Sequence, residues 1–135
     1  MNNLEKIVPL PELCKRIPAG EFEESALVWH YAEEVGFVCR ISGYEQIRKK
    51  VWKVVQNYPG KIARFRKYGE EIYPAPTLEE ICLVLRNLSA TILDNEINVA
   101  CKIDPETWIR EKAKNGDVTS AALRVWLKMK GFEVR

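Results

Sequence analysis

Residues 73–81 are Tyr73-Pro74-Ala75-Pro76-Thr77-Leu78-Glu79-Glu80-Ile81, and they join an extended entry to the start of a helix. Each proline fixes its own φ and disfavours the helical region for the residue before it. Thr77 and Glu80 have the spacing of a capping box, in which each side chain bonds the other residue's backbone N–H. The apolar residues that follow, up to Leu88, recur at helical spacing on a wide face. The stretch therefore predicts a helix over 77–88 that is buried under neighbouring elements.

Downstream of this helix, residues 90–103 have the pattern of a β-hairpin. From 97 to 103, every second residue is apolar, which is the period of a half-buried strand. Asp94 and Asn95 stand in the predicted turn, where both residue types tolerate left-handed φ. Two strands alone are marginal in water, so we expect this hairpin to have a further strand or a helix as cover.

Two more helices are predicted towards the C-terminus. Asp104 followed by Pro105 has the order of an N-cap and a first helical turn, which favours a polar helix over 105–114. A helix over 118–130 places alanines, Val125, Trp126 and Met129 on one apolar face. Its predicted end is a Schellman motif, with Gly131 left-handed and the next residue folding back.

The N-terminal third is less regular, with a short helix predicted within 9–18. Residues 21–41 fit two alternatives, either strands at 27–31 and 37–41 or a single helix from 21 to 35. Glu33 and Glu34 would oppose the dipole at the end of such a helix, and this favours the strands.

A helix is also predicted over 44–58. Ser42 and Glu45 have capping-box spacing, and apolar residues then recur at i, i+3, i+4 and i+7. Residues 61–72 fit either a strand or a helical turn. Together these elements predict an α+β domain, in which several helices pack on a small antiparallel sheet or hairpins.

Length and composition set limits on the class of protein. The chain has 135 residues, of which 47% are apolar, and this fits a single globular domain over 1–135. No run of about 18 apolar residues is present, so we expect no membrane span. The first residues lack the profile of a secretory signal, and we therefore expect a cytoplasmic protein.

Three segments resemble parts of small uncharacterised proteins encoded in phages and prophages of gut bacteria. The segments are Ile17-Pro18-Ala19-Gly20-Glu21-Phe22-Glu23-Glu24-Ser25-Ala26-Leu27-Val28-Trp29, the stretch 73–81 quoted above, and Ala121-Ala122-Leu123-Arg124-Val125-Trp126-Leu127-Lys128-Met129-Lys130-Gly131. The resemblance implies a bacterial or phage setting, and it implies no catalytic residue, ligand or partner. Residues 42–68 fit it least.

The most distinctive charge pattern lies in that same region. Residues 44–68 carry eight Lys or Arg and a single acid, Glu45, interleaved with aromatic residues. Cations that neutralise phosphates beside aromatic faces are typical of nucleic-acid surfaces. If the helix over 44–58 forms, Lys49, Lys50 and Lys53 share one exposed face. The predicted nucleic-acid-binding residues are Arg48, Lys49, Lys50, Lys53, Arg64, Arg66 and Lys67.

The sequence offers little for catalysis or metal binding. It has no Gly-rich phosphate loop, no nucleophile elbow and a single histidine, His30, which we expect to be a packed or rim residue. The four cysteines, Cys14, Cys39, Cys82 and Cys101, are widely spaced, so we expect free thiols. We expect no catalytic residue, no metal site and no cofactor.

The remaining hypothesis is a non-catalytic protein-interaction module. Four tryptophans are many for this length, and aromatic residues dominate interface energetics. Trp29, Trp108 and Trp126 are the candidate anchors, and an exposed Trp108 would favour this hypothesis over core packing. Nucleic-acid binding by residues 44–68 is the alternative. The sequence leaves the partner and the oligomeric state open.

Overall fold

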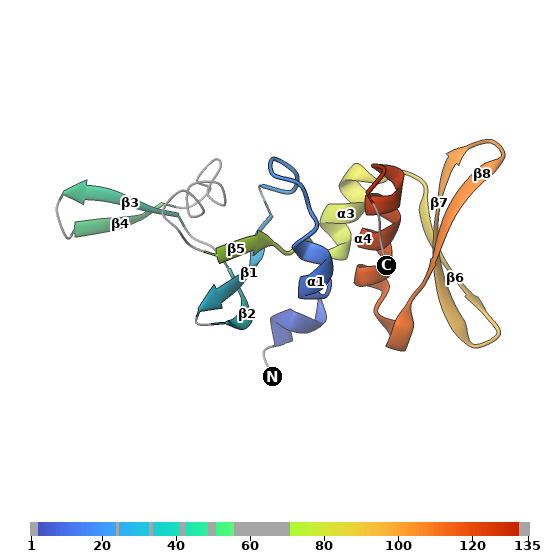
Figure 1. Cartoon of the computed structure of the whole chain (residues 1–135), viewed down its shortest axis with the longest axis horizontal. Helices are drawn as coiled ribbons and strands as arrows, with labels where there is room; N and C mark the ends of the chain where they lie inside the picture. Colours follow the sequence, from blue (N-terminus) through green and yellow to red (C-terminus); the bar gives the residue numbers. More distant parts are fainter. Residues whose placement is uncertain are drawn as a thin grey trace.

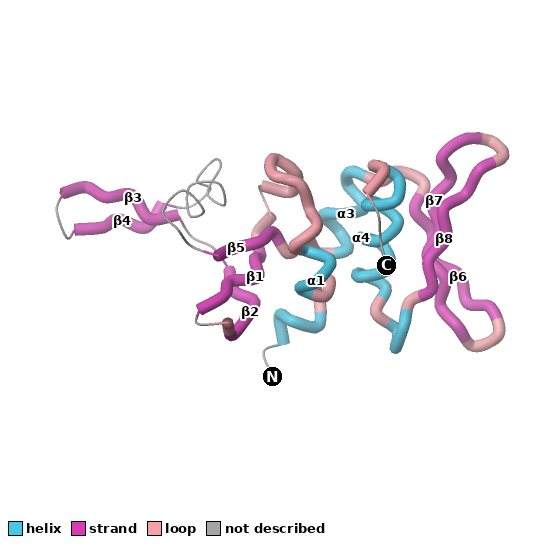
Figure 2. Tube along the Cα trace, viewed as in Figure 1, coloured by secondary structure: helices cyan, strands magenta, loops and turns pink. Residues whose placement is uncertain are grey.

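Two three-stranded antiparallel sheets flank a group of helices in this protein. The computed structural model describes residues 3–23, 25–32, 34–40, 43–48, 51–55 and 71–132. Within those residues, one sheet has the strand order β2-β1-β5, the other has β6-β7-β8, and β3 pairs with β4 in a separate hairpin. Figure 2 shows the α-helices between the two three-stranded sheets. The α+β class predicted from the sequence is confirmed.

The first sheet is formed around the strands predicted in the N-terminal third. β1 (Leu27–Ala32) pairs antiparallel with β2 (Val35–Arg40) on one side and with β5 (Glu71–Pro74) on the other. The two-strand alternative is thus correct, and the single helix over 21–35 is excluded. Across the β1–β2 pair, a Cβ on Gly36 would lie 2.7 Å from the Tyr31 ring, so any larger residue at this position would have to displace the ring.

The helix predicted over 44–58 is wrong. β3 (Gly43–Arg48) and β4 (Val51–Val55) form an antiparallel hairpin in which Tyr44 stands opposite Val54. The apolar residues of this segment recur at helical spacing, but several of them are valines. β-branched residues lose rotamer freedom in a helix and fit a strand. Figure 1 shows this hairpin at one end of the molecule, beyond β1, β2 and β5.

The helix at the centre of the sequence prediction is present but shorter. α3 (Leu78–Val84) begins after Thr77, whose Oγ1 accepts the Glu80 N–H at 3.3 Å. In return, a Glu80 carboxylate oxygen accepts the Thr77 N–H at 2.9 Å. The predicted capping box is therefore confirmed.

The wide buried face predicted for this helix is wrong. Ile81 is its buried residue, whereas Cys82 is exposed and Leu83 is 76% exposed. The helix ends at Val84, which is exposed, and Leu85 follows it with extended backbone and a buried side chain.

The second sheet contains the predicted hairpin and one strand more. β6 (Leu88–Leu93) pairs with β7 (Glu96–Asp104), and β7 pairs with β8 (Thr107–Lys112). Asp94 and Asn95, between β6 and β7, both have positive φ, as predicted for this turn. The hairpin over 90–103 is confirmed.

The helix predicted over 105–114 is wrong, because β8 occupies this region. The Asp104 carboxylate does accept the Glu106 N–H at 2.9 Å, but in the turn of the β7–β8 hairpin. An aspartate that bonds the backbone two residues on forms an Asx-turn with the same chemistry as an N-cap. The local sequence signal therefore served a hairpin turn rather than a helix start.

The C-terminal helix forms as predicted. After the short 3-10 turn η2 (Lys114–Gly116), α4 (Val118–Met129) starts at Asp117, whose carboxylate accepts the Ser120 N–H at 3.0 Å. At its other end Gly131 has a φ of 84°, which confirms the predicted left-handed cap.

The end of α4 is a complete Schellman motif. The Phe132 N–H donates to the Leu127 carbonyl at 2.9 Å, and the Gly131 N–H donates to the Lys128 carbonyl at 3.0 Å. Both bonds are those that define the motif.

The α4 helix, and not α3, lies at the centre of the core. It packs against α1, α3, β7 and β8, and Figure 1 shows it between the other helices and the second sheet. Helices buried this completely are apolar on nearly all sides. Its buried residues are Thr119, Ser120, Ala121, Ala122, Leu123, Val125, Trp126 and Leu127.

The N-terminal segment ties the first sheet to α4. After η1 (Asn3–Lys6), the Pro9 carbonyl accepts the Trp29 Nε1–H at 3.0 Å. The Leu10 N–H then donates to the Ser120 hydroxyl at 2.9 Å, just before α1 (Pro11–Cys14). One hydrophobic core thus includes residues of both three-stranded sheets and of α1, α3 and α4.

Candidate interaction surface

The second sheet has one face against α4 and one face turned away from it. The strand register places Cys101 opposite both Leu88 and Ile109, and these three residues contribute to the core. Since side chains alternate along a strand, the neighbouring positions lie on the other face. We call this the outer face, and its residues are Ser89, Thr91, Glu96, Asn98, Ala100, Lys102, Trp108, Arg110 and Lys112.

Trp108 is the largest side chain on the outer face, and it is 44% exposed. Its cross-strand partner is Lys102, whose Nζ lies 5.8 Å from the centroid of the Trp108 ring. A cation at this distance is attracted by the electrons of the aromatic face. The contact holds the lysine over the ring, so a Trp108 side chain that is still 44% exposed lies next to a positive charge.

The other charges on the outer face are mainly positive. Arg110 stands opposite Ala100, and Lys112 stands opposite Asn98. Lys112 forms an ion pair with Glu96, which neutralises one of these cations. The face therefore presents an aromatic ring, hydroxyl and amide groups and an excess of positive charge, a set that suits an acidic partner surface.

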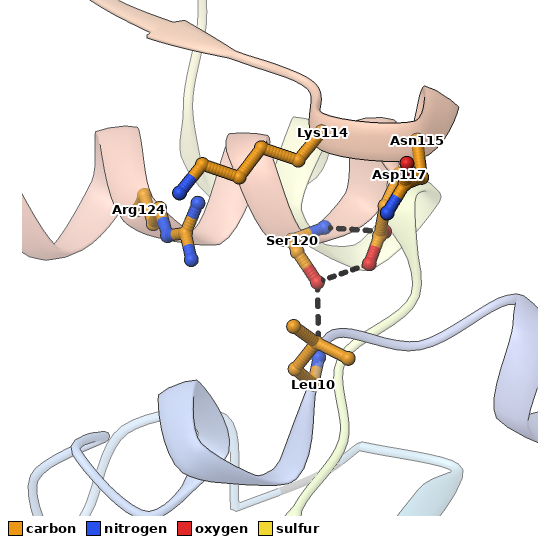
Figure 3. Close-up of a pocket in the computed structure, with 6 residues that line it drawn as sticks. All are labelled: Leu10, Lys114, Asn115, Asp117, Ser120 and Arg124. Carbon is orange, nitrogen blue, oxygen red and sulfur yellow. Dashed lines mark hydrogen bonds between the residues drawn. The ribbon is translucent and has the colours of Figure 1, made fainter.

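A pocket of about 360 Å³ lies where the N-terminal segment meets the start of α4 (Figure 3). Its acid, Asp117, accepts hydrogen bonds from both the N–H and the hydroxyl of Ser120. Figure 3 shows Lys114 and Arg124 extending along the opposite side of the pocket, with their charged ends towards each other. The lining residues are Leu10, Lys114, Asn115, Asp117, Ser120 and Arg124.

The pocket carries two cations, Lys114 and Arg124, and one acid, Asp117. The Arg124 Nε is buried and has no hydrogen-bond acceptor among the described residues. A buried donor without an acceptor is unfavourable. Neither cation was predicted as a site residue, because 114 and 124 are separated in sequence and only the fold brings them together.

Two of the seven predicted nucleic-acid-binding residues, Arg48 and Lys53, lie in the described part of the chain. Arg48 ends β3 and Lys53 lies within β4, so Lys53 is on a strand and not on the predicted helix. Lys49, Lys50, Arg64, Arg66 and Lys67 lie outside the described residues. Nucleic-acid binding by this segment stays a prediction.

His30 and the possible metal ligands are the side chains that bear on catalysis. His30 is half-buried in β1, with its ring 5.2 Å from that of Phe37. Among the described residues, no group of three or more His, Cys, Asp or Glu could hold a metal ion. No helix in the described part of the chain is long and apolar enough to cross a membrane.

The thiols differ widely in environment. Cys14 and Cys101 are buried, Cys39 is intermediate and Cys82 is exposed. Burial raises the pKa of Cys14 strongly, and the Glu12 and Asp117 carboxylates add to this effect. Burial also raises the pKa values of Cys39 and Cys101. Such thiols resist ionisation and are poor nucleophiles.

Lys102, Arg110 and Lys112 are surface residues that the sequence analysis missed. They were missed because residues 105–114 were assigned to a helix, which would have separated Arg110 and Lys112 from Lys102. The alternation of Trp108, Arg110 and Lys112 with Ile109 and Glu111 is a strand signal that could have grouped them.

Comparison with known proteins adds no identification. No protein-family model, no curated protein and no solved structure matches this chain.

Proposed function

We propose that this protein is a non-catalytic interaction module, and that it binds a partner protein through the outer face, with Trp108 as the anchor. The observation that carries the proposal is the exposure of Trp108. Trp29 and Trp126 are buried in the core, whereas Trp108 lies on a sheet face that no described element covers. Tryptophan and arginine are enriched among the residues that dominate binding energy.

The chemistry of the outer face favours an acidic segment of the partner. Lys102 stands opposite Trp108, and Arg110 lies two residues further along the same strand. Lys112, the third cation of this face, is paired with Glu96. Complementary charge at the rim speeds association and excludes like-charged partners. The resemblance of three segments to phage and prophage proteins suggests an accessory role in the cytoplasm of a bacterium.

Quantitative capture from a bacterial lysate tests this function. Immobilised wild-type protein is compared with Trp108→Ala and with Val35→Ala, a control at an apolar residue that is 67% exposed in the other sheet. We expect that the wild type and the control retain a bacterial protein and that Trp108→Ala does not. Circular dichroism checks that all three proteins are equally folded. Retention that is equal for all three would overturn the proposed surface.

The nucleic-acid alternative is tested by the same proteins in a fluorescence-anisotropy titration. Binding by residues 44–68 would fall steeply with salt, because neutralised phosphates release counterions. It would weaken when Lys49, Lys50 and Lys53 are changed to Gln and stay unchanged in Trp108→Ala. No binding of single- or double-stranded DNA below about 100 μM at low salt would end this alternative.

A further inference from the structure

The β6 strand is an open sheet edge that lacks the usual protection. Edge strands expose unpaired backbone groups, and proteins block them with charges, prolines, short length or cover. β6 lies at the end of its sheet and contains Leu88, Ser89, Ala90, Thr91, Ile92 and Leu93, with no charge and no proline. Ile92 is 75% exposed.

The other edges of the two three-stranded sheets are protected. β8 carries Arg110, Glu111 and Lys112, and β5 is short, with Glu71 at its start and Pro74 at its end. β2 is contacted by η1. Among these four described edges, β6 alone combines exposed residues from Ser89 to Ile92 with an uncharged, strand-forming sequence.

The turn between β6 and β7 determines which backbone groups of β6 are free. Asp94 and Asn95 both have positive φ, as a two-residue type I′ turn requires. The residues that flank such a turn, Leu93 and Glu96, exchange both of their backbone hydrogen bonds. Hydrogen-bonded and non-hydrogen-bonded pairs then alternate along the hairpin.

It follows that Leu88, Ala90 and Ile92 direct their N–H and C=O groups away from β7 and towards the open edge. An independent contact supports this assignment. The carbonyl of Ile97, which stands opposite Ile92, accepts the Ala113 N–H at 2.8 Å, on the β8 side of the sheet. The Ile92–Ile97 pair is therefore a non-hydrogen-bonded one.

We propose that β6 pairs antiparallel with β6 of a second copy, about a two-fold axis that is normal to the sheet and passes beside Ala90. In this register Ala90 faces Ala90 of the second copy, and Leu88 faces Ile92 of the second copy. Each of these pairs exchanges both free backbone hydrogen bonds. No charge meets a like charge across the junction, and a two-fold contact closes on itself instead of growing into a filament.

The same register also brings side chains of matching polarity together. Leu88, Ala90 and Ile92 lie on the α4 side of the sheet by alternation, so pairing brings apolar residues of two copies together. It also places both outer faces on one side of a continuous sheet. This inference goes beyond the proposed function, and two Trp108 anchors on one side would let a repeated partner bind with avidity.

Sedimentation velocity on the full chain tests the pairing. We expect the weight-average mass of the wild type to rise towards that of two chains between about 1 μM and 1 mM. Ile92→Lys should weaken association about tenfold or more, because it places two new cations at the junction. Val35→Lys is the matched control on β2 and should associate like the wild type. A wild type that stays monomeric, or an Ile92→Lys protein that associates equally well, overturns the proposal.

Disulfide trapping tests the register separately. In a Cys82→Ser background, Ala90→Cys should form a cross-linked pair on mild oxidation, since directly opposed residues lie about 5.5 Å apart between Cα atoms. Thr91→Cys should cross-link at least several-fold less. Trapping of Thr91→Cys in preference to Ala90→Cys contradicts the two-fold at Ala90. Neither experiment depends on the partner of the outer face, so the two proposals can fail independently.

Discussion

Ser25 and Glu80, 55 positions apart in the chain, meet with the Ser25 hydroxyl 3.1 Å from a carboxylate oxygen of Glu80. The other carboxylate oxygen accepts the Ala26 N–H at 3.2 Å. The residue that caps α3 therefore also holds the segment leading into β1. A local sequence signal thus has a second, tertiary role.

We expect Glu80→Ala to lower the free energy of unfolding by about 2 kcal/mol, because it removes the carboxylate half of the capping box and the charge-assisted hydrogen bonds to the Ser25–Ala26 segment. Glu79→Ala is the matched control, since Glu79 is exposed in the same first turn. Its loss should be well under 1 kcal/mol. Urea denaturation of both variants gives the comparison, and equal losses would contradict the double role of Glu80.

The central position of α4 predicts a contrast between two leucines. Leu123 is fully buried in α4, whereas Leu83 is mostly exposed in α3. Leu123→Ala should cost about 2–5 kcal/mol through lost burial and a cavity. Leu83→Ala should change the free energy of unfolding by about 0.5 kcal/mol or less. A large loss for Leu83→Ala would instead support the sequence-based prediction that α3 is the buried helix.

The raised pKa of Cys14 predicts a loss of stability in alkaline solution. The thiol stays protonated in the folded protein but ionises near its ordinary value of 9.0 once the chain unfolds. Its contribution is therefore complete below pH 9 and is lost as pH rises from there towards the higher folded pKa. The free energy of unfolding should fall by up to about 1.4 kcal/mol per pH unit from this thiol.

Cys14→Ala isolates that contribution. The substitution should lower stability at neutral pH but reduce its slope against pH above 9, as measured by urea denaturation at a series of pH values. Cys39 and Cys101, whose pKa values are also raised by burial, still contribute in both proteins. Identical slopes for the wild type and Cys14→Ala would exclude Cys14 as a source of the pH dependence.

The sequence predicted elements correctly where local and tertiary requirements agree. The capping box at Thr77 and the Schellman ending at Gly131 are local motifs, and both are present. The β6–β7 hairpin was recognised because its alternation and its Asp94-Asn95 turn indicate the same structure.

The incorrect predictions share one physical origin, because each rested on a local sequence pattern that fits two different structures. Asp104 bonds a following N–H in a hairpin turn as readily as at a helix start. The apolar residues of 44–58 fit a helical period, but their valines also suit strands. The outer face was missed because the alternation over 108–112 was assigned to a helix. The pocket was not predictable, because Lys114 and Arg124 are brought together only by the fold.

The most direct test of the proposed function is site-specific photo-crosslinking on the outer face beside Trp108. A photoreactive phenylalanine analogue replaces Ala100, which stands opposite Arg110 on this face, and the same analogue at Val35 serves as the control. Irradiation in bacteria should yield a discrete adduct with another protein from position 100, lost when Trp108→Ala is added, and none from position 35. No adduct from position 100, or the same adducts from both positions, would contradict a binding surface on the outer face.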